Sequence, residues 1–169
     1  MENNEGFSMV ELIIVIAIMA ILVGAIAPTL IKYVQKSRAT ADVSNADTIA
    51  GCVQEALVDK EVEQYIFDNT TSLPLTLDVG SIDPSNNKFE EFLYENLGGG
   101  LPDVKYKKNG ATGFEVVVYS LNGSTNDVGE ADWGVQILAK GASVSAGSPT
   151  PQVAHGCVLW PEPDLAYKQ

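Results

Sequence analysis

The stretch Gly6-Phe7-Ser8-Met9-Val10-Glu11-Leu12 leads directly into a long apolar run. From Leu12 to Ala27 no side chain is polar or charged, and Pro28-Thr29-Leu30-Ile31 extends the run by four positions. These twenty residues would rise about 30 Å as an α-helix, which is the thickness of the hydrocarbon core of a bilayer. After Lys32 the sequence is polar and has no second run of this length. We therefore predict one membrane-spanning helix followed by a soluble domain.

Composition limits the classes of function. The 169 residues fit one domain with a core of useful size. Lys and Arg number 10 and Asp and Glu number 22, for a formal net charge of −12. A nucleic-acid-binding surface needs a basic patch that faces the phosphates, so this excess argues against nucleic acid as a partner of the isolated chain. The charge suits a soluble, self-repelling outer surface.

The helix is predicted to run from about Phe7 to Val58. Its first half is apolar on every face, as in a segment surrounded by lipid or by other helices. Its second half is amphipathic, because apolar residues recur at spacings of three, four and seven. These residues are Val34, Ala41, Ile49, Cys52, Val53, Ala56 and Leu57. Charged residues lie mostly off this stripe: Lys32, Lys36, Arg38, Asp42 and Asp47. One face of the second half should therefore pack on a sheet.

Two residues weaken the first half of this helix. Pro28 removes one backbone hydrogen bond and crowds the preceding turn, so a kink or local loosening is expected there. Gly24 lowers the helix propensity of the same stretch.

Residues 59–103 are predicted to form an irregular connection with one short helix inside it. Asp83-Pro84 suits a helix start, because proline is favoured in the first turn. Phe89, Phe92, Leu93 and Leu97 would make its apolar face. The run Gly98-Gly99-Gly100 would end it.

The rest of the chain predicts an antiparallel meander. Strand patterns cover Val104–Lys108, Phe114–Leu121, Trp133–Ala139 and Val153–Trp160. Asn109-Gly110 and Asn122-Gly123 are turn signals beside them, and Pro161 and Pro163 end the last strand. The expected fold class is α+β, with a long N-terminal helix packed on a small antiparallel sheet.

Cys52 and Cys157 are the only cysteines. No C-x-x-C motif and no Cys/His ligand cluster is present, so the sequence supports neither a zinc site nor a thioredoxin-like motif. In an exported protein two cysteines suggest one disulfide. The alternative is two small buried thiols. Sequence alone does not place the two Cα atoms within bonding reach.

Glu11 is a carboxylate at the mouth of the apolar run, with no basic residue within two helical turns. Ionisable residues in a membrane span are costly and usually mark function. The alternative is that Glu11 lies at the headgroup level and that the span starts at Leu12. On the cost of burying a charge alone, both positions of Glu11 remain open.

Gly6-Phe7-Ser8-x-x-Glu11 before an apolar helix resembles the processing site of type IV prepilins and related pseudopilins. The resemblance covers about residues 6–38, and beyond them it is architectural. It implies that a prepilin peptidase cuts between Gly6 and Phe7 and that Phe7 then becomes the N-methylated terminus. It implies that Glu11 pairs with the N-terminal amine of a neighbouring subunit and so sets register. Pro28 matches a proline common midway along the pilin helix.

The N-terminal leader departs from the family pattern. Prepilin leaders usually carry Lys or Arg before the glycine, whereas this one has Glu2 and Glu5 and no basic residue. The basic residues Lys32, Lys36 and Arg38 lie beyond the span, and the positive-inside rule alone would place the large domain in the cytoplasm. The cleavage motif argues for export, and a leader extending upstream of Met1 would remove the conflict.

Other candidate sites carry weaker signals. His155 is the only histidine, and no G-x-S-x-G element accompanies it. An oxygen-rich loop suits calcium but fits no EF-hand, and a solvated loop is the favoured interpretation. It comprises Asn122, Asn126, Asp127, Glu130 and Asp132. Trp133, Trp160 and Tyr119 are expected in the core or on the sheet face. No cofactor and no metal is expected.

The resemblance implies a structural, non-catalytic subunit of a type IV pilus. The expected organisation is a leader (1–6), a transmembrane and filament-core helix half (7–31) and a globular headgroup (32–169). Before assembly the prepilin would lie in the inner membrane, with lipid, the prepilin peptidase/methyltransferase and the assembly machinery as partners. Afterwards it would form a homo-oligomeric filament, or fimbrium, at the cell surface. The alternatives are a pseudopilin of a type II secretion or competence system and a membrane-anchored surface binding protein that does not polymerise.

Overall fold

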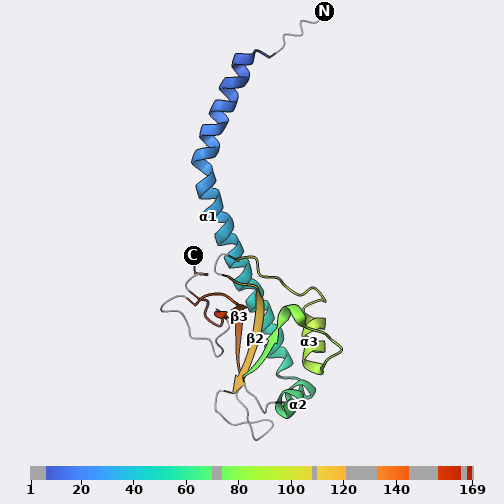
Figure 1. The fold of residues 1–169 in the computed structure, drawn as a ribbon. Helices are drawn as coiled ribbons and strands as arrows, with labels where there is room; N and C mark the ends of the chain where they lie inside the picture. Colours follow the sequence, from blue (N-terminus) through green and yellow to red (C-terminus); the bar gives the residue numbers. More distant parts are fainter. Residues whose placement is uncertain are drawn as a thin grey trace, which may run out of the picture. The chain divides into compact units, whose positions relative to one another are not determined.

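The computed structural model describes residues 7–69, 74–107, 110–120, 133–144, 156–164 and 167–168. The chain forms two compact units, Met1–Ser37 and Arg38–Gln169. In chain order the elements are α1 (Met9–Ala56), α2 (Lys60–Asn69), β1 (Leu75–Asp78), the 3-10 turn η1 (Val79–Ser81), α3 (Lys88–Asn96), β2 (Gly113–Ser120), β3 (Trp133–Lys140) and β4 (Gly156–Trp160) (Figure 1). This confirms the α+β class.

Helix α1 is 48 residues long and confirms the predicted helix to within two residues at each end. It stays helical through Gly24 and Pro28 (Figure 1), so the kink expected there remains a prediction. In the first unit the apolar side chains are exposed, as the fully apolar pattern predicts for a segment that needs lipid or other helices around it.

In the second unit α1 buries one face in the core. The buried residues are Ala39, Ala46, Ile49, Ala50, Val53 and Ala56. Of the predicted stripe Ile49, Val53 and Ala56 are fully buried, whereas Val34 is 42% exposed. Asp42 was predicted to lie off the apolar stripe with the other charged residues, and this is wrong, because its relative exposure is 0%. The many alanines on this face let neighbouring backbone approach closely.

The sheet is a four-stranded antiparallel meander in the order β1-β2-β3-β4. Because side chains alternate between the two faces of a strand, Val116 and Val118 of β2 join the core that α1 also lines. Val117 faces the other side and packs with Leu138 and Val158 in a second cluster. In Figure 1 the second half of α1 runs alongside β2 and β3. The expected packing of this helix half on the sheet is therefore confirmed.

Three of the four predicted strands are confirmed as β2, β3 and β4, and β4 begins at Gly156. The strand predicted at 104–108 is wrong for its described residues, 104–107, which form no strand. Instead the backbone N–H groups of Lys105 and Tyr106 donate to the carboxylate of Asp42 on α1, at 2.8 and 2.7 Å. The fourth strand is β1, Leu75–Asp78, which pairs with β2.

The connection 59–103 is more regular than predicted, because it also contains α2. This helix starts where the Asp59 carboxylate accepts hydrogen bonds from the N–H groups of Glu61 and Val62, at 2.8 and 3.3 Å. An acidic side chain in that position satisfies two N–H groups that have no partner within the helix.

Helix α3 starts four residues after Pro84, so the predicted start at Asp83-Pro84 is wrong. Its N-cap is Asn87, whose side chain accepts from the Glu90 N–H at 2.9 Å. The Glu90 carboxylate accepts in turn from the Asp83 N–H at 2.8 Å and so holds the preceding turn closed. The predicted end is confirmed, because Gly98 and Gly99 have φ values of 71° and 67°, which favour glycine.

Candidate processing and assembly site

The N-terminus of α1 is organised by a capping box. Phe7 and Ser8 precede the helix, which starts at Met9. The Ser8 N–H donates to Oε2 of Glu11 at 2.9 Å, and Oγ of Ser8 accepts from the Val10 N–H at 3.4 Å. These bonds satisfy N–H groups at the helix start, and the spacing Ser-x-x-Glu before an apolar run is their sequence signature. This capping box was not predicted, although Ser8 and Glu11 carry its signature in the sequence.

The capping box defines the surroundings of Glu11. A carboxylate in the first turn is favoured by the positive end of the helix dipole. Its Oε2 atom is engaged with Ser8, whereas no donor from the described residues reaches Oε1. Phe7 lies outside the helix with 81% of its surface exposed. Gly6, the other residue of the predicted cut, lies outside the described residues.

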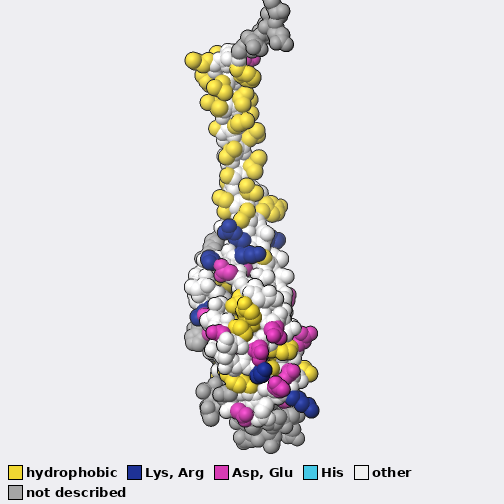
Figure 2. All heavy atoms as spheres, turned by 90° about the vertical axis from the view of Figure 1, so that its right-hand side faces the viewer, with side chains coloured by type: hydrophobic (Ala, Val, Ile, Leu, Met, Phe, Trp, Pro, Cys, Tyr) yellow, Lys and Arg dark blue, Asp and Glu magenta, His cyan; other side chains and the backbone are white. Residues whose placement is uncertain are grey.

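The helix that follows is apolar on its exposed surface. Among the described residues α1 alone is long and apolar enough to cross a membrane, with a mean hydropathy of 2.9 over a window of which none is buried. Figure 2 shows hydrophobic side chains covering its first half on the face in view. A surface of this kind requires lipid or other apolar helices around it.

Residues 1–27 match the family model described as the prokaryotic N-terminal methylation motif. The chain carries the type IV prepilin signature. This signature together with the long apolar helix is consistent with a membrane-anchored prepilin. No curated protein and no solved structure matches the chain.

The remaining predicted site residues of the prepilin-like chain lie within regular elements. Gly24 and Pro28 are inside α1. Cys52 is half-buried on α1 and Cys157 is buried on β4, and both are thiols in the structure. Cys157 belongs to the main core cluster and Cys52 packs against it, and the disulfide between them stays a prediction. Burial raises the pKa of Cys157 to about 12 and, together with Glu55, raises the pKa of Cys52.

The weaker candidates lie partly outside the described residues. These are His155 and the oxygen-rich loop formed by Asn122, Asn126, Asp127, Glu130 and Asp132, so calcium binding there stays untested. Within the described ranges no three His, Cys, Asp or Glu residues are grouped to hold a metal ion. Trp133 and Trp160 pack against the main core and Tyr119 against the second cluster, which confirms the expectation of sheet-face residues.

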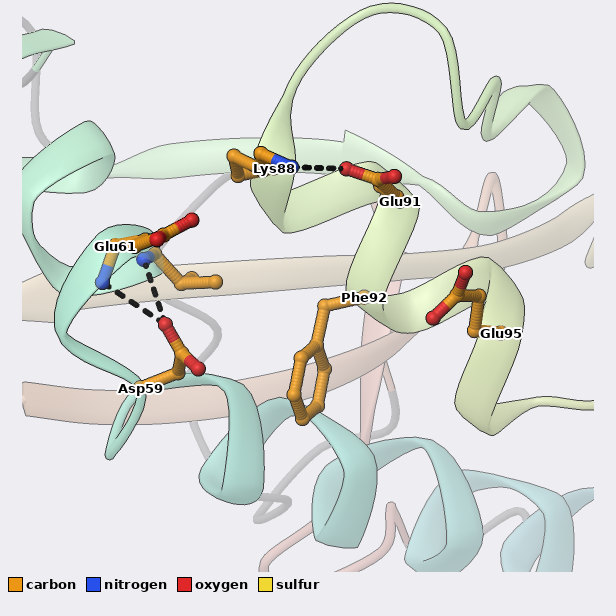
Figure 3. Close-up of a pocket in the computed structure, with 7 residues that line it drawn as sticks. Asp59, Glu61, Lys88, Glu91, Phe92 and Glu95 are labelled. Carbon is orange, nitrogen blue, oxygen red and sulfur yellow. Dashed lines mark hydrogen bonds and ion pairs between the residues drawn. The ribbon is translucent and has the colours of Figure 1, made fainter.

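A groove of about 210 Å³ between α2 and α3 was not predicted (Figure 3). It is lined by Asp59, Glu61, Val62, Lys88, Glu91, Phe92 and Glu95. Lys88 Nζ donates to Oε2 of Glu91 at 2.9 Å, and Asp59 already caps α2. Figure 3 shows the Phe92 ring between Asp59 and Glu95. These contacts account for the groove as the junction of two helices, and its lining holds no histidine, cysteine, serine or threonine.

Proposed function

We propose that the chain is the structural subunit of a type IV pilus, made as a membrane-anchored prepilin and polymerised through the first half of α1. The observation that carries the proposal is the methylation-motif match at residues 1–27 on a helix whose apolar side chains are exposed. The membrane satisfies this surface before assembly, and the same surface packs against other subunits afterwards. No catalytic activity is part of the proposal.

Processing would occur at the start of α1. A prepilin peptidase would cut between Gly6 and Phe7, and its methyltransferase activity would modify the new amine of Phe7. The exposure of Phe7 and its position before the capped helix support access to the amine. The mature chain would then move from the inner membrane into an extracellular filament.

Glu11 would set the register of assembly. A charge moved into an apolar filament core is costly unless an opposite charge meets it with good geometry. The amine of Phe7 on a neighbouring subunit would supply that charge. Adhesion would come from packing of the apolar helix halves, so the pair selects one arrangement rather than supplying most of the energy.

The second candidate is a pseudopilin of a type II secretion or competence system, because the N-terminal motif supports it equally. Inspection of the neighbouring genes would distinguish the two, since a pilus and a secretion system have different accessory components.

Substitutions at Glu11 test the assembly role. Glu11→Gln keeps an acceptor for the Ser8 N–H but removes the charge, whereas Glu11→Ala removes both. If charge pairing sets register, both variants stay in the membrane and both form few or no filaments in electron micrographs. Glu55→Gln, at an exposed position of the same helix, is the matched control and should assemble normally.

The two variants separate charge pairing from capping. Loss of filaments in Glu11→Ala alone would assign Glu11 to capping. Normal filaments in both variants would reject an assembly role for Glu11.

A further inference from the structure

The first unit has opposite charges at the two ends of its apolar surface. Between Glu11 and Lys32 no residue is charged, and Lys36 follows Lys32 one helical turn later. Residues at i and i+4 share a helix face, so the two ammonium groups lie on one side. Tyr33 stands beside them with 67% of its surface exposed. In Figure 2 Lys and Arg side chains follow directly on the apolar surface of α1.

The spacing of these charges matches a bilayer. Lys32 lies 21 positions after Glu11, which corresponds to about 32 Å of helix, and the hydrocarbon core is about 30 Å thick. When the apolar segment spans the membrane, Glu11 reaches one headgroup layer and Lys32 the other. Lys side chains extend toward the interface, and Tyr rings are enriched at the same depth.

We propose that Lys32, Tyr33 and Lys36 form a basic collar that binds anionic phospholipid headgroups. The ammonium groups donate hydrogen bonds to phosphate oxygens, and the Tyr33 ring lies at the boundary with the acyl chains. The collar holds the prepilin at the depth that places Phe7 and Glu11 at the opposite membrane face. The inference rests on the membrane-anchored stage of the proposed function.

A second copy of this chain is the competing occupant, because a net charge of −12 offers many carboxylates. The collar begins at the residue that ends the apolar run, which is the position of phosphate groups in a bilayer. The net charge by itself singles out no carboxylate of a second copy as the partner of the collar. The observations therefore favour lipid.

The test measures the lipid that the full chain retains. The chain in detergent is mixed with equal amounts of phosphatidylglycerol and phosphatidylcholine, and retained lipid is quantified by native mass spectrometry. The wild type should retain phosphatidylglycerol preferentially. Each Lys→Gln change should lower that preference by about fivefold, and Lys32→Gln with Lys36→Gln by more than tenfold. Lys60→Gln with Lys107→Gln, at exposed positions of the second unit, should leave it unchanged.

Three outcomes would overturn the inference. The first is equal retention of both lipids by the wild type, and the second is an unchanged preference in the double variant. The third is a carbodiimide cross-link from Lys32 to a carboxylate of an isotope-labelled second copy, in a chain that shows no lipid preference. In each case a chain that still inserts into vesicles leaves the proposed function standing. A chain that fails to insert into vesicles of either lipid would reject the membrane stage itself.

Depth control has its own readout. In phosphatidylglycerol vesicles that contain the prepilin peptidase, the rate of leader removal is measured by mass spectrometry. This rate should fall several-fold in the variant Lys32→Gln with Lys36→Gln. It should stay unchanged in the control variant Lys60→Gln with Lys107→Gln. Equal cleavage rates would reject the depth role of the collar.

Discussion

Removal of the Asp42 carboxylate should destabilise the second unit more than any other single charge change on α1. Asp42 is fully buried, and its two oxygens accept the N–H groups of Lys105 and Tyr106. These bonds attach the segment after α3 to the helix, across 63 and 64 residues of sequence.

The magnitude follows from this geometry. A hydrogen bond to a charged acceptor contributes about 1.5–3 kcal/mol, and a buried N–H group left without a partner costs about 1–3 kcal/mol. The cost of burying the carboxylate disappears with it and offsets part of the loss. We expect Asp42→Ala to lower the free energy of unfolding by about 2–4 kcal/mol. Asp42→Asn keeps one acceptor but turns an NH₂ group toward the second N–H, so about 1–3 kcal/mol is expected.

The effect should depend on pH with a definite sign. Burial, as the largest cause, raises the pKa of Asp42 above its ordinary value of 3.8. The folded state therefore binds this proton more tightly than the unfolded state does. The stability from that proton is complete below pH 3.8 and is lost as pH rises through the raised folded pKa. The advantage of the wild type over Asp42→Asn should shrink as pH rises through this window.

The assay is urea unfolding of the full chain in detergent, followed by Trp133 and Trp160 fluorescence. Asp47→Ala, at an exposed position of α1, is the control and should change stability by less than about 0.5 kcal/mol. An Asp42→Ala variant as stable as the control, or an advantage that grows with pH, would refute the reasoning.

Two further predictions concern the core. Gly51→Ala places a methyl group in open space on α1 and should raise the free energy of unfolding by about 0.5–1 kcal/mol. Gly156→Ala drives its Cβ into the Ala139 carbonyl and should lower that free energy by about 1–3 kcal/mol. Urea unfolding measures both changes, and equal shifts would contradict this packing. Native maleimide labelling should modify Cys52 first, because a pKa of about 12 lowers the thiolate fraction of Cys157 about 1,000-fold. Labelling only after reduction would instead establish the disulfide.

The sequence predicted the elements whose signal is local. The apolar run and the spacing of Ile49, Val53 and Ala56 were enough for α1, and short apolar runs beside turn signals were enough for β2 and β3. Helix α2 was not predicted, although Asp59 just before it is a capping residue.

The position of Asp42 was not predictable in the same way, because its partners lie more than 60 residues away. The segment 104–107 carries a strand-like pattern, yet its backbone N–H groups bond to that side chain and not to a neighbouring strand. The role of the first half of α1 was predicted from the Gly6-Phe7-Ser8-x-x-Glu11 motif and not from packing. Its large apolar side chains are exposed in the single chain.

The proposed function requires that the chain is processed at Phe7 and then assembled. Mass spectrometry of the chain purified from the filament fraction of cells tests it most directly. We expect a mature chain that lacks residues 1–6 and carries one methyl group on the amine of Phe7. A chain that retains residues 1–6, or a cut elsewhere that leaves Phe7 internal, would contradict it.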